Sequence, residues 1–243
     1  MRFKALFALA VALLPQLAQA DGCRDMVHDG QGYTVCETTA VGDVALFHTT
    51  PDGTPYGSFA RIDAELATRG KRLGFAMNAG MYHPDRAPVG LLVEGGTARG
   101  RLVTAAGPGN FGLLPNGVFC VTDRFAVIES RRFAADPPAC REASQSGPML
   151  VIDGALHPRF LVDSDSRYVR NGVGVSADGR RAVFAISQGA VTFHQFGRLF
   201  RDGLALPNAL YFDGSISRLY APELRRNDIG FPMGPIVGLV VPN

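Results

Sequence analysis

The sequence predicts an α+β fold, in which a strand-rich mixed sheet and a few packed helices form a single domain. Short apolar runs bounded by Gly, Pro, Asn and Asp recur along the chain, as expected of strands joined by turns. The 29 glycines and 16 prolines fit many turns, and only two segments space their apolar residues as helices do. The predicted strands cover residues 33–38, 44–49, 73–77, 90–93, 118–122, 125–129, 149–152, 173–175, 182–187, 209–212 and 236–241.

Two helices are predicted. The first begins after Ser58 and ends at Gly70, and the second begins at Thr192. Each repeats apolar residues three or four positions apart, which places them on one buried face. Aromatic residues at this spacing indicate core packing rather than a cofactor site. The faces consist of Phe59, Ile62, Leu66 and Ala67 in the first helix, and Phe193, Phe196, Leu199 and Phe200 in the second.

The first 20 residues have the composition of a secretory signal peptide. Arg2 and Lys4 precede an apolar run at 5–14 that is too short to span a bilayer, and a small-x-small cleavage signal follows at 18–20. No later segment has an uninterrupted apolar run long enough for a membrane anchor. We therefore expect a signal peptide at 1–20 and one periplasmic or secreted domain at 21–243.

The mature chain would have no net charge, which argues against polyanionic partners and is compatible with a small-molecule substrate. The full chain has 24 basic and 22 acidic residues. Arg2 and Lys4 would be lost with the signal peptide, which leaves equal numbers of each sign. Nothing here predicts binding to nucleic acid or to an anionic membrane surface.

The chain has four cysteines: Cys23, Cys36, Cys120 and Cys140. An even number in an exported chain indicates two disulfides. Of the three possible pairings, local spacing favours Cys23–Cys36 and Cys120–Cys140. A zinc site is the competing interpretation, but no Cys-x-x-Cys pair and no closely spaced His pair is present. No metal ligand is predicted, and the sequence identifies no cofactor.

Polar side chains stand beside glycines after several of the apolar runs. The most informative case is 209–217, where four apolar residues lead into Asp213, a glycine and two serines. A hairpin turn would explain one such segment, because Asp-Gly is a common turn signal. Five of them suggest a shared polar pocket at the strand ends, where backbone can approach a ligand. The five segments are 78–82, 94–96, 145–148, 170–174 and 213–217.

The order of these motifs resembles the phosphodiester glycosidase domain family, whose members include the enzyme that uncovers mannose 6-phosphate and many exported bacterial proteins. The resemblance runs from about Leu73 to Val241. Each motif alone is weak evidence, but the motifs occur in the order found in the family, which argues against a chance resemblance. The matching segments are 75–82, 90–96, 116–119, 145–151, 170–175, 184–187 and 209–214.

The resemblance implies a hydrolase that releases a sugar from its phosphodiester link. Matched position by position, Asn78, Arg170 and Asp213 would lie in the pocket, and Ser146, Gly147 and Gly214 would frame it. Asn171 and Ser217 are further candidates for contacting the substrate. The neighbours of Arg170 and Asp213 differ from the family's usual residues, which leaves the identity of the sugar open.

Roles follow from the chemistry of glycosyl transfer, which usually needs a pair of carboxylates. Asp213 is the candidate nucleophile or general base, and Glu94 is the second carboxylate. Arg170 is the candidate phosphate-binding residue, since arginine meets a phosphate with a planar pair of donors. The alternatives are a turn residue for either acid and a structural ion pair for Arg170. His83 and His157, each before a proline, are interpreted as loop residues.

Two other classes of function remain open. A serine hydrolase would need a nucleophile elbow, and no Gly-x-Ser-x-Gly motif occurs. A periplasmic glycan-binding module without catalysis would keep the pocket but would not need Asp213. A cleft that contains both Asp213 and Glu94 would favour the enzyme.

Overall fold

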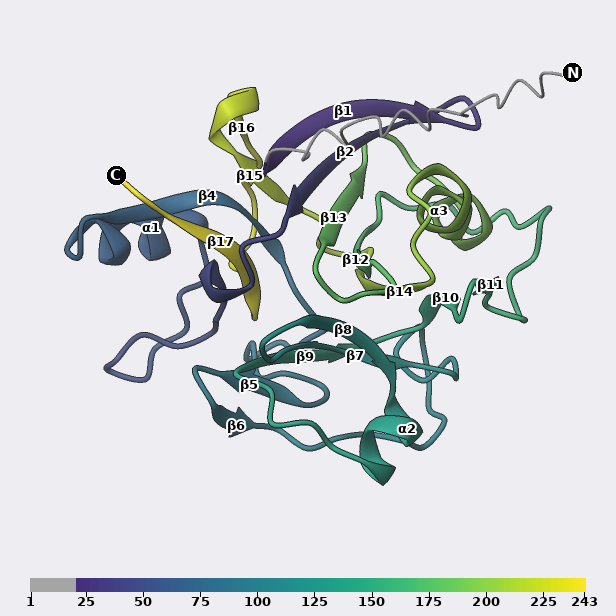
Figure 1. Ribbon diagram of the computed structural model, residues 1–243, viewed down its shortest axis with the longest axis horizontal. Helices are drawn as coiled ribbons and strands as arrows, with labels where there is room; N and C mark the ends of the chain where they lie inside the picture. The colour runs from purple at the N-terminus through teal and green to yellow at the C-terminus, as the bar shows by residue number, and fades with distance from the viewer. Residues whose placement is uncertain (1–20) are drawn as a thin grey trace, which may run out of the picture.

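The computed structural model describes residues 21–243, and the strand-rich α+β class is confirmed (Figure 1). The segment predicted as a signal peptide, 1–20, lies outside the described residues. The strands form three sheets in which every pairing is antiparallel, instead of one mixed sheet. Among the described residues, no helix is long and apolar enough to cross a membrane.

The first sheet has seven strands in the order β1-β2-β13-β12-β14-β10-β11. Buried apolar side chains alternate between its faces along β14, so that one face packs on α3 and the other on the two smaller sheets. Its strands are β1 (Gly22–His28), β2 (Gln31–Thr38), β10 (Met149–Ile152), β11 (Ala155–Leu156), β12 (Asn171–Val175), β13 (Ala182–Ser187) and β14 (Asn208–Asp213).

The other two sheets have five strands each, in the orders β16-β15-β4-β17-β3 and β6-β5-β9-β7-β8. The second sheet contains β3 (Val44–Phe47), β4 (Lys71–Asn78), β15 (Leu219–Ala221), β16 (Arg226–Asn227) and β17 (Ile236–Pro242). The third contains β5 (Leu92–Glu94), β6 (Thr97–Arg99), β7 (Gly117–Val121), β8 (Phe125–Glu129) and β9 (Glu142–Ser146).

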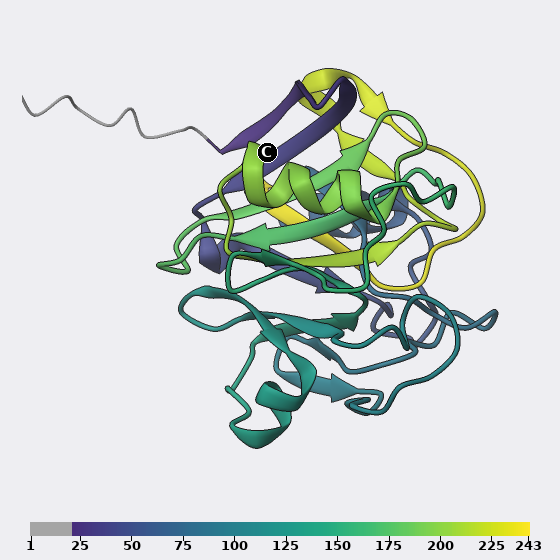
Figure 2. The same cartoon turned by 90° about the vertical axis from the view of Figure 1, so that its right-hand side faces the viewer.

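Three α-helices pack on these sheets. They are α1 (Phe59–Ala67), α2 (Ser130–Ala135) and α3 (Phe193–Arg198), which continues as a π-helix over Leu199–Gly203. Short 3-10 turns cover Val41–Asp43 and Pro222–Leu224. Figure 2 shows α3 lying across one face of the seven-stranded sheet.

Both predicted helices begin where the sequence indicated, because each has a side-chain cap. The Ser58 hydroxyl accepts a hydrogen bond from the Arg61 N–H, and Thr192 and Gln195 form a reciprocal capping box. The short helix α2 was missed. It is capped by the Glu129 carboxylate, and one and a half turns are too few for a visible periodicity.

The three sheets meet at a cluster of phenylalanine rings. Phe119 of β7 packs edge-on against Phe184 of β13 at 5.6 Å between ring centroids, and against Phe212 of β14 at 6.5 Å. Phe75 of β4 lies 5.4 Å from Phe184. Since each ring comes from a different strand, this core fixes β4, β7, β13 and β14 relative to one another.

Strand β9 was missed because its sequence is polar. All five residues of Glu142–Ser146 are nevertheless buried. Their side chains bind backbone groups of neighbouring loops: Glu142 accepts hydrogen bonds from Leu46 N and Gly95 N, and Gln145 accepts one from Leu91 N. Because Gln145 holds this segment, the strand predicted at 90–93 is displaced and runs over Leu92–Glu94 instead.

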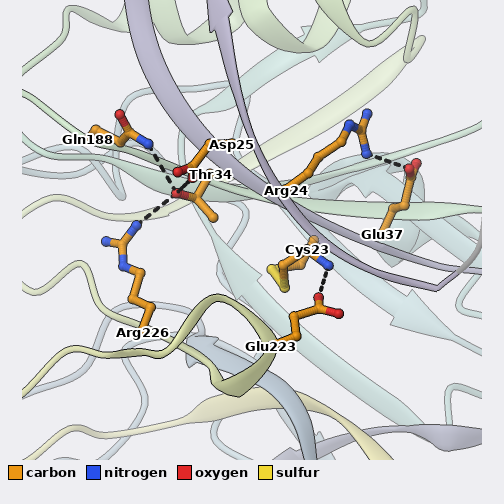
Figure 3. Close-up of a disulfide and its surroundings, with 9 residues drawn as sticks. Cys23, Arg24, Asp25, Thr34, Glu37, Gln188, Glu223 and Arg226 are labelled. Atoms are coloured by element: carbon orange, nitrogen blue, oxygen red, sulfur yellow. Dashed lines mark hydrogen bonds and ion pairs between the residues drawn. A yellow bond between two sulfur atoms is a disulfide. The ribbon is translucent and has the colours of Figure 1, made fainter.

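Both disulfides favoured by local spacing are present. Cys23 and Cys36 are paired positions of the β1–β2 hairpin, with Cα atoms 3.9 Å apart. Figure 3 shows this bridge beside Glu223, whose carboxylate accepts a hydrogen bond from the Cys23 N–H. Cys120 and Cys140, with Cα atoms 5.5 Å apart, close the segment that contains β8 and α2.

Replacing both Cys120 and Cys140 with Ala should lower the free energy of unfolding by about 3 kcal/mol, since a loop of this size then gains entropy in the unfolded chain. Urea denaturation monitored by circular dichroism measures this change as a lower midpoint. An unchanged midpoint would show that the bridge closes a segment that is already ordered in the unfolded state.

Candidate active site

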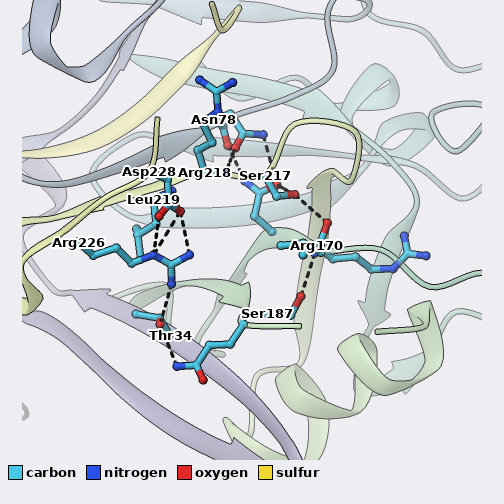
Figure 4. A network of polar contacts seen from close by, with 12 residues as sticks. Thr34, Asn78, Arg170, Ser187, Ser217, Arg218, Leu219, Arg226 and Asp228 are labelled. Carbon is cyan, nitrogen blue, oxygen red and sulfur yellow. Dashed lines mark hydrogen bonds and ion pairs between the residues drawn. The ribbon is translucent and has the colours of Figure 1, made fainter. Parts of the chain in front are cut away.

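The end of β4, the start of β12 and the end of β14 meet, and their side chains form one hydrogen-bonded network. Asn171 is paired with Asp213 across the β12–β14 ladder, and its Oδ1 accepts a hydrogen bond from the Asp213 N–H at 3.2 Å. The same oxygen accepts from Asn78 Nδ2 at 3.3 Å, and Ser217 Oγ lies 3.3 Å from it. Four residues predicted from three separate motifs therefore lie together, and Figure 4 shows two of them, Asn78 and Ser217.

Asp213 ends β14 with only 9% of its surface exposed. Its Oδ1 accepts hydrogen bonds from the N–H groups of Gly214 at 2.6 Å and Ser215 at 2.8 Å. Burial raises the pKa of the carboxyl above its ordinary range, and these backbone donors offset part of the rise. Asp213 has no ion pair with an arginine or histidine among the described residues. Backbone N–H groups therefore fix the position of its carboxylate, but no positive side chain balances its charge.

Arg170 is completely buried and has no carboxylate partner in the part of the chain that the structure describes. Its Nε donates to Val191 O at 2.9 Å and its Nη2 to Ser166 O at 3.1 Å, while Nη1 has no partner among these residues. Burial lowers the pKa of the guanidinium, although an arginine remains charged at neutral pH. The ion-pair alternative is therefore excluded for the described residues.

Arg170 is held in place by a column of parallel rings. Its Cζ lies 3.6 Å from the centroid of the Phe193 ring. Phe193 stacks on Phe160 at 5.1 Å, and Phe160 stacks on His157 at 4.8 Å. His157 is thus a packing residue at the far end of the column, and burial lowers its pKa. The cation–π contact partly compensates the buried charge and fixes the plane of the guanidinium.

Two tyrosines near Asp213 were not recognised in the sequence. The hydroxyls of Tyr82 and Tyr211 are buried and have no hydrogen-bond partner among residues 21–243. Burial raises the pKa of each, and the negative charge of Asp213 raises it further. Tyr211 could have been found, because residues two positions apart on a strand share a face and it stands two before Asp213.

The residues predicted to frame the pocket, Ser146, Gly147 and Gly214, have structural roles. Ser146 Oγ donates to Phe212 O at 2.8 Å and so ties β9 to β14. A Cβ at Gly147 would lie 2.6 Å from Asn116 Cβ, and one at Gly214 would overlap the Tyr211 hydroxyl. Both glycines are therefore required by close approach of neighbouring groups.

The structure does not bring Glu94 into this network. Its Oε1 accepts a hydrogen bond from His48 N at 2.8 Å, and its Oε2 pairs with Arg99 Nε at 3.2 Å. The glycines after it form the turn of the β5–β6 hairpin. His83 likewise lies in an exposed turn closed by its own backbone hydrogen bonds.

Arg218 is a second arginine that the sequence did not single out. Its backbone N–H donates to Asn78 Oδ1 at 2.9 Å, so it joins the network through Asn78. Figure 4 shows the two guanidinium groups pointing away from each other.

The site combines one buried carboxylate, an unpaired guanidinium and two buried phenols. Within residues 21–243, no group of three or more His, Cys, Asp or Glu side chains is arranged to hold a metal ion. Guanidinium and phenol donors are suited to an oxyanion, and a carboxylate with a raised pKa is suited to nucleophilic or proton-transfer chemistry.

A family model described as phosphodiester glycosidase matches residues 71–231. A relative in Escherichia coli (strain K12), the uncharacterized protein YigE, is 36% identical over 216 residues. That alignment covers 87% of this chain and 83% of the relative.

Two solved structures share the fold at low identity. The zebrafish N-acetylglucosamine-1-phosphodiester α-N-acetylglucosaminidase catalytic domain, auto-inhibited by its pro-peptide, superimposes with a TM-score of 0.60 and 11% identity, covering 89% of this chain and 81% of that one. A protein from Burkholderia pseudomallei K96243, described as exported, gives 0.58 and 10%, covering 86% and 74%.

Proposed function

This chain belongs to the phosphodiester glycosidase family, and we propose that it is an exported hydrolase that cleaves the glycosidic bond between a sugar and the phosphate of a phosphodiester. The substrate would be a glycan or a compound derived from one. The two disulfides support a periplasmic or secreted location, because such bonds persist in oxidising compartments.

One observation carries the proposal: Arg170 is a buried cation without a counter-ion. Leaving a charge uncompensated inside a protein costs several kcal/mol, and a phosphate placed against Nη1 would offset that cost. Val191 O and Ser166 O accept hydrogen bonds from Nε and Nη2, and the phosphate would accept one from Nη1, which has no partner among the described residues. The column of Phe193, Phe160 and His157 would keep the guanidinium oriented for it.

Asp213 would carry the chemistry. Its carboxylate attacks the anomeric carbon, or removes a proton from the water that attacks it, while the bond from that carbon to the phosphate oxygen breaks. The phosphate leaves with the electron pair as a phosphomonoester. In the first route, water then hydrolyses the glycosyl ester, which releases the sugar and regenerates the Asp213 carboxylate. Because phosphate is a good leaving group, a second carboxylate acid is not required, and Tyr82 and Tyr211 can donate hydrogen bonds to the departing oxygens.

Asn78, Asn171 and Ser217 would mainly position Asp213. The Asn171 amide already binds the Asp213 N–H, the Asn78 carbonyl oxygen and the Asn78 side chain. Ser217 Oγ donates to Asp213 O at 2.8 Å. These contacts use most of the hydrogen-bonding capacity of the three side chains and leave little for a substrate.

The raised pKa of Asp213 predicts an unusual acid limb in the pH profile. Either role needs the ionised carboxylate, so kcat/KM on a sugar phosphodiester should fall as the pH decreases through this pKa. Because burial stabilises the neutral form, the fall should begin at a higher pH than the value of 3.8 for an ordinary aspartate. If kcat/KM instead stays constant until the pH reaches the ordinary range of an aspartate, the ionisation of Asp213 does not control the reaction.

A glycan-binding module without catalysis is the alternative, and one observation favours it. Glycosidases usually place two carboxylates around the scissile bond, whereas Glu94 is engaged with Arg99 and His48. A hydrolysis screen on sugar phosphodiesters distinguishes the two functions. Release of reducing sugar that is lost in Asp213→Asn supports the enzyme, and binding without release in both proteins supports the module.

A further inference from the structure

Arg218 is a second arginine at the site, and its guanidinium has no hydrogen-bond partner among the described residues. Only 9% of its surface is exposed. No carboxylate, carbonyl or hydroxyl among the described residues accepts a hydrogen bond from its guanidinium, and only its backbone N–H is bound, to Asn78.

Three other partly buried arginines are each paired with an acid. Arg181 pairs with Glu37 at 3.0 Å, Arg226 with Asp228 at 2.8 Å and Arg141 with the buried Glu142 at 2.9 Å. The fold therefore has acids available for arginines with a structural role. Arg170 and Arg218 have no such acid partner among the described residues, and both stand next to the Asn78–Asn171–Asp213 network.

The surroundings of Arg218 connect it to the same reacting centre. Tyr82 lies within electrostatic reach of both Asp213 and Arg218. On its other side, the Arg218 guanidinium packs against the backbone of Gly230, where a Cβ would overlap it. The residues on either side of that glycine, Ile229 and Phe231, are 89% and 80% exposed, so the guanidinium lies beneath an exposed loop.

The two guanidinium groups extend in different directions from the network, so a phosphate bound at Arg170 leaves Arg218 without a partner (Figure 4). We propose that Arg218 binds a second anionic group of the substrate. The sugar phosphodiester taken by this site would then carry a phosphate or a carboxylate in addition to the scissile phosphodiester. This inference rests on the proposed function, in which Arg170 binds the scissile phosphate.

Isothermal titration with three probes tests the inference: glucose 1-phosphate, glucose 1,6-bisphosphate and glucuronic acid 1-phosphate. The wild-type protein should bind at least one of the doubly anionic sugars about tenfold more tightly than glucose 1-phosphate, the value of one charge-assisted hydrogen-bonded pair. Which of the two gains affinity distinguishes a phosphate from a carboxylate. Arg218→Met should abolish this preference and leave the affinity for glucose 1-phosphate unchanged.

Arg131→Met is the matched control, because Arg131 is exposed on α2 and its side chain contacts only Thr104 O. It should keep the wild-type preference. Arg218→Lys retains a charge and should keep part of it, which also decides the matter if Arg218→Met fails to fold in a thermal melt.

Equal wild-type affinity for all three probes would overturn the inference and leave the proposed function standing. A preference that survives in Arg218→Met would do the same. If no probe binds folded wild-type protein, or if binding of glucose 1-phosphate is independent of Arg170, the proposed function itself fails.

Discussion

Asp213→Asn should lower kcat on a sugar phosphodiester by about 10²–10⁴-fold, the range for loss of a group that acts in the transition state. The amide is nearly the same shape, and its oxygen can still accept hydrogen bonds from Gly214 N and Ser215 N. It can neither attack the anomeric carbon nor accept a proton. Steady-state kinetics on the two proteins measure the effect.

The same variant should not be less stable at neutral pH. Between the pKa of the unfolded chain and the higher pKa of the folded state, only folded Asp213 retains its proton, so the free energy of unfolding falls as the pH rises through this window. Above it, the buried negative charge destabilises the fold. Asp213→Asn should therefore melt at an equal or higher temperature at neutral pH, with less pH dependence.

Asp153→Asn is a suitable control for both measurements, since Asp153 is exposed and pairs only with the exposed Arg132. It should change neither kcat nor the melting curve appreciably. A folded Asp213→Asn protein that turns over as fast as the wild type would mean that Asp213 is a turn residue and that the proposed mechanism is wrong.

Arg170→Lys should reduce kcat/KM by about 10²–10³-fold, as expected when an oriented donor to a developing oxyanion is lost. Lysine keeps the charge but loses the planar pair of donors and the flat stacking surface over Phe193. Because the phosphate is bound in the ground state and in the transition state, KM should rise at least as much as kcat falls.

Arg131→Lys on α2 is the control for this substitution and should behave as the wild type. Kinetics and phosphate-ester binding on the three proteins distinguish the possible outcomes. Unchanged KM in folded Arg170→Lys would show that the guanidinium is structural and that the scissile phosphate lies elsewhere.

The sequence predicted which strand ends carry polar groups because an acid or amide beside a glycine marks such ends locally. Asn78, Asn171 and Asp213 were identified in this way and do lie together. Glu94 carries the same local signal, yet its glycines form a plain hairpin turn. Which strand ends meet depends on how the three sheets pack around Phe119 and Phe184, and no local pattern encodes that.

Buried polar groups were the other limit of the sequence. Gln145 and Glu142 look like surface residues, but their side chains complete the hydrogen bonds of loop backbone inside the protein. The sequence did not single out Arg218, which follows a serine and stands in no distinctive motif. That its guanidinium has no acceptor among the described residues depends on tertiary packing, and no local sequence pattern encodes it.

The disulfide of the β1–β2 hairpin bears on association between molecules. β1 is an edge strand of the seven-stranded sheet, and β2 is the next strand in the same sheet. If β1 peeled away, β2 would present an unpaired backbone to any other extended chain, which is how edge strands seed aggregation. The Cys23–Cys36 bond joins paired positions of the two strands. Oxidation therefore holds β1 on β2, and reduction would make it easier for β1 to separate and expose the backbone of β2 in protein that is otherwise folded.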